Sequence, residues 1–223
     1  MTDRRPVLFS SARSPHCFKV SLVLREKGID FDRVEIDLPA REQKTPAYLA
    51  LNPLGQVPVY QDEDGVHVDS LVIMRHLDRK HPEPLLFPTD AEALAAVLDW
   101  IELSSTAMRD VSHHLYWQIL EPPEAGPDVD RVAALKAEGM ALLARVEAAL
   151  ADGGGWLVGG RLSAADLSVF AWLHGYARYE LPTSSDGLEH YAAWRARLVA
   201  RPSFTESFGR VGRPFETWLA DTR

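Results

Sequence analysis

The sequence is poor in cysteine and has no long apolar run. Cys17 is the only cysteine among 223 residues, so no disulfide can form within the chain, and a secreted, disulfide-rich scaffold is excluded. Only three apolar residues separate the N-terminal Met1-Thr2-Asp3-Arg4-Arg5-Pro6 from Ser10, which is too short for a signal-peptide core, and no segment reaches the length of a membrane span. We therefore expect a cytoplasmic protein without a membrane partner.

An excess of positive charge is also absent. The formal net charge is −8 and the isoelectric point is about 5.5, and a field of that sign repels the phosphates of nucleic acids. Hydrophobic residues make up 46% of the chain and charged residues 25%, as is usual for a soluble globular protein. Nucleic acid is therefore not an expected partner.

The first part of the sequence predicts a small α/β domain. Ser14 and Pro15 suit the N-cap and the first position of a helix, and Gly28 suits its end. Ser70 suits the N-cap of another helix. The predicted elements are, in order, a strand at 7–9, a helix at 14–28, a strand at 31–38, a hairpin of strands at 57–60 and 66–68, and a helix from 70 to before Pro82.

The remainder of the sequence predicts helices alone, with no strand after residue 89. Ser163-Ala164-Ala165-Asp166 is similar to a capping box with aspartate in place of glutamate, and a glycine-rich stretch precedes it. The predicted helices cover residues 91–119, 129–150, 163–172 and 188–199. We therefore predict an α/β domain at 1–82, a proline-rich linker at 83–90 and an all-α domain at 91–223.

Three motifs occur in an order that identifies a family. Leu51-Asn52-Pro53-Leu54-Gly55-Gln56-Val57-Pro58, then Asp69-Ser70, then Ser163-Ala164-Ala165-Asp166 resemble the cytosolic, bacterial-type glutathione S-transferases. The resemblance covers residues 7 to about 202. It implies a thioredoxin-like N-terminal domain, an all-helical C-terminal domain and a homodimer. Candidate dimer contacts are Met74 and Leu77 on one helix and Leu94 and Leu98 on the next.

The resemblance also implies a catalytic role for Ser14. Ser14-Pro15-His16-Cys17 resembles the Cys-Pro-x-Cys of glutaredoxins with serine in place of the attacking cysteine. In the zeta and theta transferase classes a serine at this position donates a hydrogen bond to the glutathione sulfur, and the omega class has cysteine there. Ser11 is the second choice, because some bacterial relatives place their key residue in the preceding turn. We expect Cys17 to be a small buried side chain rather than a nucleophile.

Four further residues match the part of the family's pocket that binds the γ-glutamyl and cysteinyl groups of glutathione. Pro58 resembles the family's cis-proline, which would leave the backbone of Val57 to pair with the cysteinyl backbone. Ser70 would bind the γ-glutamyl carboxylate, and Asp69 would meet the γ-glutamyl amine. A simple N-cap is the alternative role for Ser70.

Three more residues match the part that binds the glycyl end. Gln43 and Lys44 stand where the phi class has a His-Lys pair, so Lys44 would reach the glycyl carboxylate. Gln56 would add a hydrogen bond. A solvated surface lysine is the alternative for Lys44.

The helix around residues 108–117 would provide the second-substrate site if it lies opposite Ser14. Met108, His113, Tyr116 and Trp117 suit an apolar, partly aromatic electrophile.

The same helix does not predict a metal site. His113 and His114 are adjacent, so their side chains point about 100° apart on a helix. Asp110 and His114 have the i, i+4 spacing of helical metal ligands, but no third ligand is evident in the sequence. We expect no metal cofactor.

The resemblance implies an enzyme that conjugates the glutathione thiolate to a soft electrophile, with glutathione as co-substrate. Three alternatives remain open. One is a glutathione-dependent isomerase of the zeta type, although that class has Ser-Ser-Cys where this chain has Ser14-Pro15-His16. Another is a disulfide or peroxide reductase, which could not use a dithiol because Cys17 stands alone. The third is a non-catalytic binding module of the same fold.

Overall fold

The structure, a computed structural model, describes residues 5–182, 187–207 and 212–222. These residues form two compact units, one built from the chain up to Leu85 together with the chain from Arg201 onward, and the other from Leu86–Ala200. The predicted all-α domain at 91–223 is therefore wrong at its end. The segment after residue 200 returns to the first unit, where it adds a strand to the sheet and a helix to one of its faces.

The first unit is built on a five-stranded mixed sheet in the order β4-β3-β1-β2-β5. β1 pairs in parallel with β2 and antiparallel with β3, and β3 forms a hairpin with β4, which confirms the predicted β-α-β and β-β-α order. β5 lies parallel to β2 at the edge and contradicts the expectation of no strand after residue 89. The strands are β1 (Val7–Ser10), β2 (Asp32–Glu35), β3 (Val59–Asp62), β4 (Gly65–Val68) and β5 (Arg213–Pro214).

Helices cover both faces of this sheet. Side chains alternate along β1 and β3, so Tyr60 points toward α3, where its ring centroid lies 6.2 Å from that of His76. Phe9 points the other way, toward α10, 6.0 Å from Phe215 and 4.7 Å from Trp218. The helices of this unit are α1 (Pro15–Glu26), α2 (Pro46–Leu49), α3 (Ser70–Lys80), α9 (Pro202–Ser207) and α10 (Phe215–Thr222), with a 3₁₀ turn at Glu42–Lys44.

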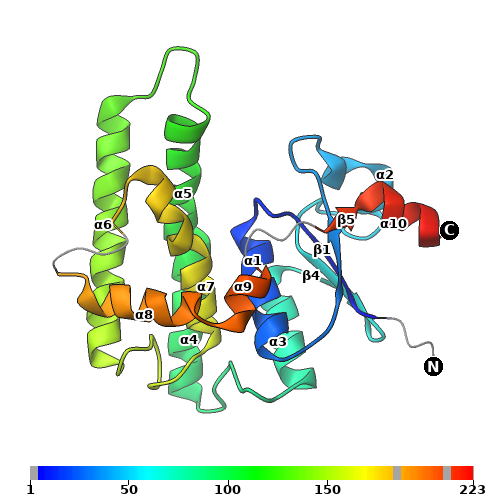
Figure 1. Cartoon of the computed structure of the whole chain (residues 1–223), viewed down its shortest axis with the longest axis horizontal. Helices are drawn as coiled ribbons and strands as arrows, with labels where there is room; N and C mark the ends of the chain where they lie inside the picture. Colours follow the sequence, from blue (N-terminus) through cyan, green and yellow to red (C-terminus); the bar gives the residue numbers. More distant parts are fainter. Residues whose placement is uncertain (1–4, 183–186, 208–211, 223) are drawn as a thin grey trace. The chain divides into compact units, whose positions relative to one another are not determined.

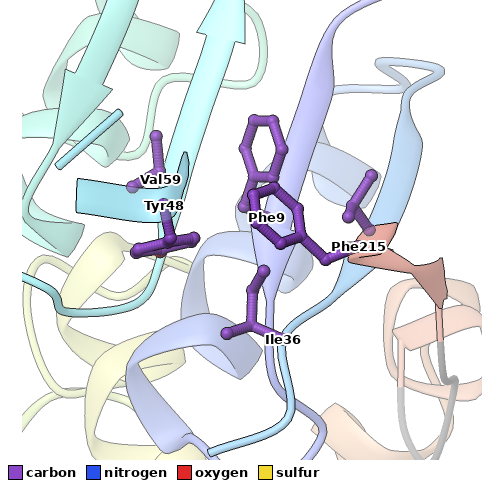
Figure 2. Close-up of a cluster of buried hydrophobic side chains, with 6 residues drawn as sticks. Phe9, Ile36, Tyr48, Val59 and Phe215 are labelled. Atoms are coloured by element: carbon purple, nitrogen blue, oxygen red, sulfur yellow. The ribbon is translucent and has the colours of Figure 1, made fainter. Parts of the chain in front are cut away.

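The face toward α2 and α10 holds an apolar cluster. Figure 2 shows Phe9, Ile36, Tyr48, Val59 and Phe215 gathered between β1, β3 and the two helices, and all five are buried. In Figure 1, α10 (red) follows β5 directly and lies beside α2. The C-terminal segment therefore completes the core of the first unit.

The second unit consists of helices. The predicted long helix runs from 91 to 120, with one π-helical turn within it at Ser104–Met108 and another at its end at Tyr116–Leu120. Figure 1 shows α5 and α6 side by side. The helices are α4 (Ala91–Leu103), α5 (Arg109–Leu115), α6 (Val129–Asp152), α7 (Ala164–Leu173) and α8 (Glu189–Val199), with a 3₁₀ segment at His174–Tyr179.

α7 is the central helix of this unit. It is mostly apolar, and every residue from Ala164 to Leu173 is buried, Asp166 and Ser168 included. The predicted capping box is confirmed, because the Asp166 carboxylate accepts hydrogen bonds from the backbone N–H of Ser163 at 2.9 Å and from its hydroxyl at 2.8 Å. Asp166 also accepts from Trp194 Nε1 on α8 at 2.9 Å. In the described residues, no helix has both the length and the apolar character needed to cross a bilayer.

Candidate functional site

Ser14 begins α1 as the sequence predicts. β1 ends at Ser10 and a short turn follows, after which Ser14 takes an extended backbone conformation with φ −102° and ψ 115°. Its Oγ accepts the backbone N–H of Cys17 at 3.3 Å, and Pro15 occupies the first helical position. The partly buried Ser14 side chain also hydrogen-bonds the Cys17 thiol, so its hydroxyl must turn from that contact to donate to another sulfur.

Ser11 and Cys17 lie deeper than Ser14. Ser11 is only 4% exposed, and its backbone N–H donates to Cys17 Sγ at 3.3 Å. Burial raises the pKa of the Cys17 thiol to about 11, against the hydrogen bonds from Ser14 and Ser11, which lower it. Cys17 is therefore a buried thiol at neutral pH, as expected.

The N-termini of α1 and α3 meet at this corner of the first unit. Ser70 is the first residue of α3, and its Oγ lies 3.3 Å from Nδ1 of His16, the second residue of α1. Both helices have their positive dipole ends here. The corner is therefore suited to bind an anion, and Ser14 lies two residues from the contact.

Asp69, rather than Ser70, is the N-cap of α3. Its Oδ1 accepts the backbone N–H groups of Leu71 at 2.8 Å and Val72 at 3.2 Å, so the predicted cap at Ser70 is wrong by one residue. Asp69 is exposed and has φ 73°, a conformation that costs on the order of 1–3 kcal/mol for a residue other than glycine. Oδ1 forms the helix cap, and Oδ2 has no hydrogen-bond partner among the described residues.

The segment before β3 contains the predicted cis peptide bond between Val57 and Pro58. Two buried side chains fix the backbone just before it, because Tyr48 Oη and Asn52 Nδ2 both donate to the carbonyl of Gln56 at 2.9 Å. In the described part of the chain, the backbone N–H and C=O of Val57 have no hydrogen-bond partner. The side chain of Gln56 is exposed.

Gln43 and Lys44 approach the same segment from the turn before α2. Lys44 Nζ donates to the carbonyl of Leu54 at 3.0 Å. Gly55 has φ +58°, and a Cβ there would lie 2.7 Å from both the Gln43 carbonyl and Lys44 Nζ, so only glycine permits this approach. Gln43 Oε1 is buried without a hydrogen-bond partner among the described residues.

The four residues predicted for the electrophile lie in the second unit. Met108 has no exposed surface and is a core residue, so its predicted contact with a ligand is not supported. His113 and Trp117 are exposed, with ring centroids 6.2 Å apart, and Tyr116 lies against Trp117 at 5.3 Å. Their position opposite Ser14 stays a prediction.

One contact at the site was missed by sequence reasoning. His16 was treated as the variable residue of Ser14-Pro15-His16-Cys17, yet it joins α1 to Ser70, which lies 54 positions further along the chain. The only signal in the sequence was that His16 follows the N-cap by two residues, next to a proline. A contact between residues so far apart in the chain depends on how α1 and α3 pack, and the sequence pattern does not give that packing.

Comparison with known proteins identifies the fold and its family. Residues 8–85 match the family model described as "Glutathione S-transferase, N-terminal domain", and residues 108–202 match "Glutathione S-transferase, C-terminal domain". The chain belongs to the glutathione S-transferase family. The transferase is 32% identical over 211 residues to Glutathione S-transferase 3 of Zea mays, with 93% of this chain and 95% of the relative covered.

Solved structures agree with this family assignment. The theta class glutathione S-transferase of Xanthomonas axonopodis pv. citri with glutathione bound is 31% identical and has a TM-score of 0.79, covering 92% of this chain and 98% of that one. The glutathione transferase URE2P8 of Phanerochaete chrysosporium with oxidized glutathione has a TM-score of 0.83 over 99% and 98% of the two chains. At 24% identity, the second comparison supports the fold alone.

Proposed function

We propose that this transferase conjugates glutathione to a soft electrophilic small molecule, with Ser14 stabilising the thiolate. The observation that carries the proposal is the 3.3 Å contact between His16 and Ser70, which brings the N-termini of two helices together next to Ser14. Glutathione has two carboxylates and a thiol that must ionise, so it gains from a corner with several donors and two positive helix ends.

The energy available from Ser14 is sufficient for this role. A thiol has an ordinary pKa of about 8.5, and lowering it by about two units requires about 2.7 kcal/mol of stabilisation of the thiolate. A hydrogen bond to a charged group contributes about 1.5–3 kcal/mol, and the positive end of a helix adds about 0.3–2 kcal/mol. Ser14 can supply the first while it accepts from Cys17 N, and α1 supplies the second.

Ser14 is preferred to Ser11 because of exposure. Ser11 is 4% exposed, whereas Ser14 is partly exposed at the helix end. The class suggested by the motifs is kept in the proposal, since the similar proteins include the theta class protein described above. The assignment to the zeta, theta and omega group of classes is part of this proposal.

The remaining groups bind the ends of glutathione. The Ser70 hydroxyl and the N-terminus of α3 bind the γ-glutamyl carboxylate, and Oδ2 of Asp69 meets the amine. The backbone of Val57, which has no hydrogen-bond partner in the described ranges, pairs with the cysteinyl residue as an added strand. Gln43 Oε1, buried and without a partner among the residues that the structure describes, is a hydrogen-bond acceptor next to Lys44, which binds the glycyl carboxylate.

Gln56 adds a hydrogen bond from its exposed side chain. The electrophile binds to the exposed His113 and Trp117 and the half-buried Tyr116 of the second unit. The proposal includes a cytoplasmic location and a homodimer.

The chemical step transfers no proton in the transition state. The glutathione thiol loses its proton to solvent on binding, and the sulfur of the thiolate then gives an electron pair to the electrophilic carbon. In a substitution, the new S–C bond forms while the leaving group departs with its bonding pair. In an addition to an activated double bond, the new S–C bond forms while the π electron pair of the double bond moves onto the activating group. A proton from water then neutralises the resulting anion.

Two experiments test the proposal. Retention on glutathione-agarose and elution with free glutathione establish binding. Assays with halonitroarenes, peroxides, disulfides and maleyl compounds then separate conjugation from reduction and isomerisation. We expect turnover of the halonitroarenes, and retention without activity on any of the four classes would indicate a binding module instead.

A further inference from the structure

A second polar cluster lies at the other end of α3, away from Ser70. Asp62 ends β3 and His67 lies in β4, opposite Tyr60 in the hairpin register. Because side chains alternate along a strand, these residues share the face that α3 covers. His76 and Lys80 are four positions apart on α3 and so share one face of the helix. The hairpin and the helix therefore place these side chains together.

The contacts in this cluster centre on one buried carboxylate. The Asp62 side chain is 1% exposed, with Oδ1 3.2 Å from His67 Nε2 and Oδ2 2.8 Å from His76 Nε2. The two imidazole rings stack with centroids 3.7 Å apart. Within the described ranges, these three residues form the one group whose possible metal-ligand atoms all lie within 4.8 Å of one another.

We propose that Asp62, His67 and His76 bind a divalent transition-metal ion of the Zn²⁺ class. Zinc bonds to imidazole nitrogen and carboxylate oxygen are about 2.0–2.2 Å long, which places two ligands of a tetrahedral ion roughly 3.3 Å apart. The distance of 3.2 Å from His67 Nε2 to Asp62 Oδ1 is close to that value, and the distance of 2.8 Å from His76 Nε2 to Asp62 Oδ2 is shorter and must lengthen when the ion binds. The ion takes the place of the protons that the two Nε2 atoms share with Asp62.

Asp64 is the candidate for the fourth ligand. Its Oδ2 lies 4.0 Å from His76 Nε2, so a small change in its side chain brings it to the ion. Two imidazoles and two carboxylates would make a neutral site for a divalent cation. An imidazole binds a metal in the plane of its ring, so the stacked pair must open. The His67 side chain, 18% exposed, has the freedom to turn.

Lys80 competes with the ion. Its Nζ lies 3.1 Å from Asp62 Oδ2 and 2.6 Å from Asp64 Oδ2, where it neutralises the same oxygens. It also lies 2.6 Å from Glu63 Oε1, so it keeps a partner when the ion takes the two aspartates. Removing the ammonium should therefore strengthen metal binding, whereas a purely structural cluster would only lose an ion pair.

The ligand set also selects the metal. Imidazole nitrogens suit Zn²⁺, Cu²⁺ and Ni²⁺, whereas Mg²⁺ and Ca²⁺ require mainly oxygen ligands in larger number. A millimolar excess of Mg²⁺ should not displace Zn²⁺ from this site.

Calorimetric titration of the tag-free chain with ZnCl₂ tests the proposal. We expect one ion per chain, with affinity reduced about a hundredfold or more in His67→Gln and His76→Gln, because even the loss of a residue that only orients a ligand costs 10–100-fold. Lys80→Gln should bind Zn²⁺ at least about tenfold more tightly, since a neighbouring cation is removed. His114→Gln, an exposed histidine in the second unit, is the matched control and should bind as the parent does.

Three results would overturn the proposal. They are the absence of Zn²⁺ binding by the parent chain, unchanged affinity in His67→Gln, and weaker binding in Lys80→Gln. Circular dichroism establishes that each variant is folded. If His76→Gln does not fold, His67→Gln, at a partly exposed strand position, decides the result.

Discussion

We propose that Ser14 combines two roles at the start of α1. Its oxygen caps the helix by accepting the N–H of Cys17 at 3.3 Å, and in the proposal its hydroxyl donates to the glutathione sulfur. A serine hydroxyl can do both at once, because it has two acceptor lone pairs and one donor. An alanine at this position would lose both, so a change in activity must be separated from a loss of helix stability, for which a serine cap is worth about 1 kcal/mol.

Ser70 and Asp69 should act on glutathione binding rather than on chemistry. The contacts proposed for them are the same in the ground state and the transition state, so Ser70→Ala should raise KM for glutathione with a smaller change in kcat. Asp69→Asn keeps an N-cap oxygen for α3 but loses the charge that meets the amine, and it should also raise KM. Steady-state kinetics with glutathione as the varied substrate measures this. An equal fall in kcat and kcat/KM would contradict the assignment.

Asp69→Ala provides the control for capping. This substitution removes the charge and also the hydrogen bonds to the N–H groups of Leu71 and Val72. Its free energy of unfolding should therefore be about 1 kcal/mol lower than that of Asp69→Asn, which keeps the cap. Chemical denaturation of the two variants measures the difference.

Cys17 should be inert in the folded protein. Burial raises its pKa to about 11, about two units above an ordinary thiol, so the thiolate fraction at pH 8 falls about a hundredfold. Alkylation by iodoacetamide at pH 8 should therefore be at least that much slower than in the denatured chain, and Cys17→Ala should keep transferase activity. Rapid alkylation, or loss of activity in Cys17→Ala with the fold intact, would identify Cys17 as a reactive residue.

Local signals correctly predicted the N-cap at Ser14 and the cis bond at Pro58. A serine directly before a proline, as at Ser14 and Pro15, strongly favours a helix N-cap. The cis bond at Pro58 was predicted from the family motif that ends at this residue. The error at α3 came from two adjacent strong caps, Asp69 and Ser70, which propensity cannot rank. The contact between His16 and Ser70 could not be predicted, because it depends on the packing of two helices.

The C-terminal segment is the element that the sequence pattern did not reveal. β5 has only two residues, too few to show an alternating pattern, and α10 is short. Phe215 becomes a core residue only because β5 positions it against Phe9 and Tyr48. In contrast, α7 was predicted together with its capping box, because all of its signals lie within ten residues.

Phe215 should contribute strongly to stability. It is 1% exposed in the cluster on the sheet, so Phe215→Ala should lower the free energy of unfolding by about 3–5 kcal/mol. Thr217→Ala, an exposed position in the same helix, should change it by less than about 0.5 kcal/mol. Urea unfolding of both variants measures this. Equal stability of Phe215→Ala and the parent would show that α10 does not belong to the core.

The whole molecule is proposed to be a two-fold dimer. Two of the predicted contact residues, Met74 and Leu77, are fully buried within the chain and so belong to the core. Leu94 and Leu98 on α4 are partly exposed and stay candidates. Val72 on α3 is 52% exposed and is a further apolar candidate. The helical spacing of core and interface residues is the same, which is why sequence could not separate them.

Solution mass tests the dimer. We expect about twice the chain mass of 24.9 kDa over a range of micromolar concentrations. A stable isologous interface buries at least about 1,200 Å², and a dimer held by such an interface does not dissociate at these concentrations. Leu94→Asp should shift the equilibrium toward the monomer, and Val129→Asp, 74% exposed, should not. A mass near that of one chain at all concentrations would contradict the dimer.

The most direct measurement of the central claim is the pKa of glutathione bound to the transferase. Titration of the thiolate absorbance in the complex should give a pKa about two units below the ordinary 8.5, so conjugation should reach full rate at or just above neutral pH. Ser14→Ala should raise this pKa by one unit or more and keep the affinity for glutathione within about tenfold, whereas Ser11→Ala should leave it unchanged. A bound thiol that titrates alike in the parent and Ser14→Ala, or that shifts only in Ser11→Ala, would contradict the role of Ser14.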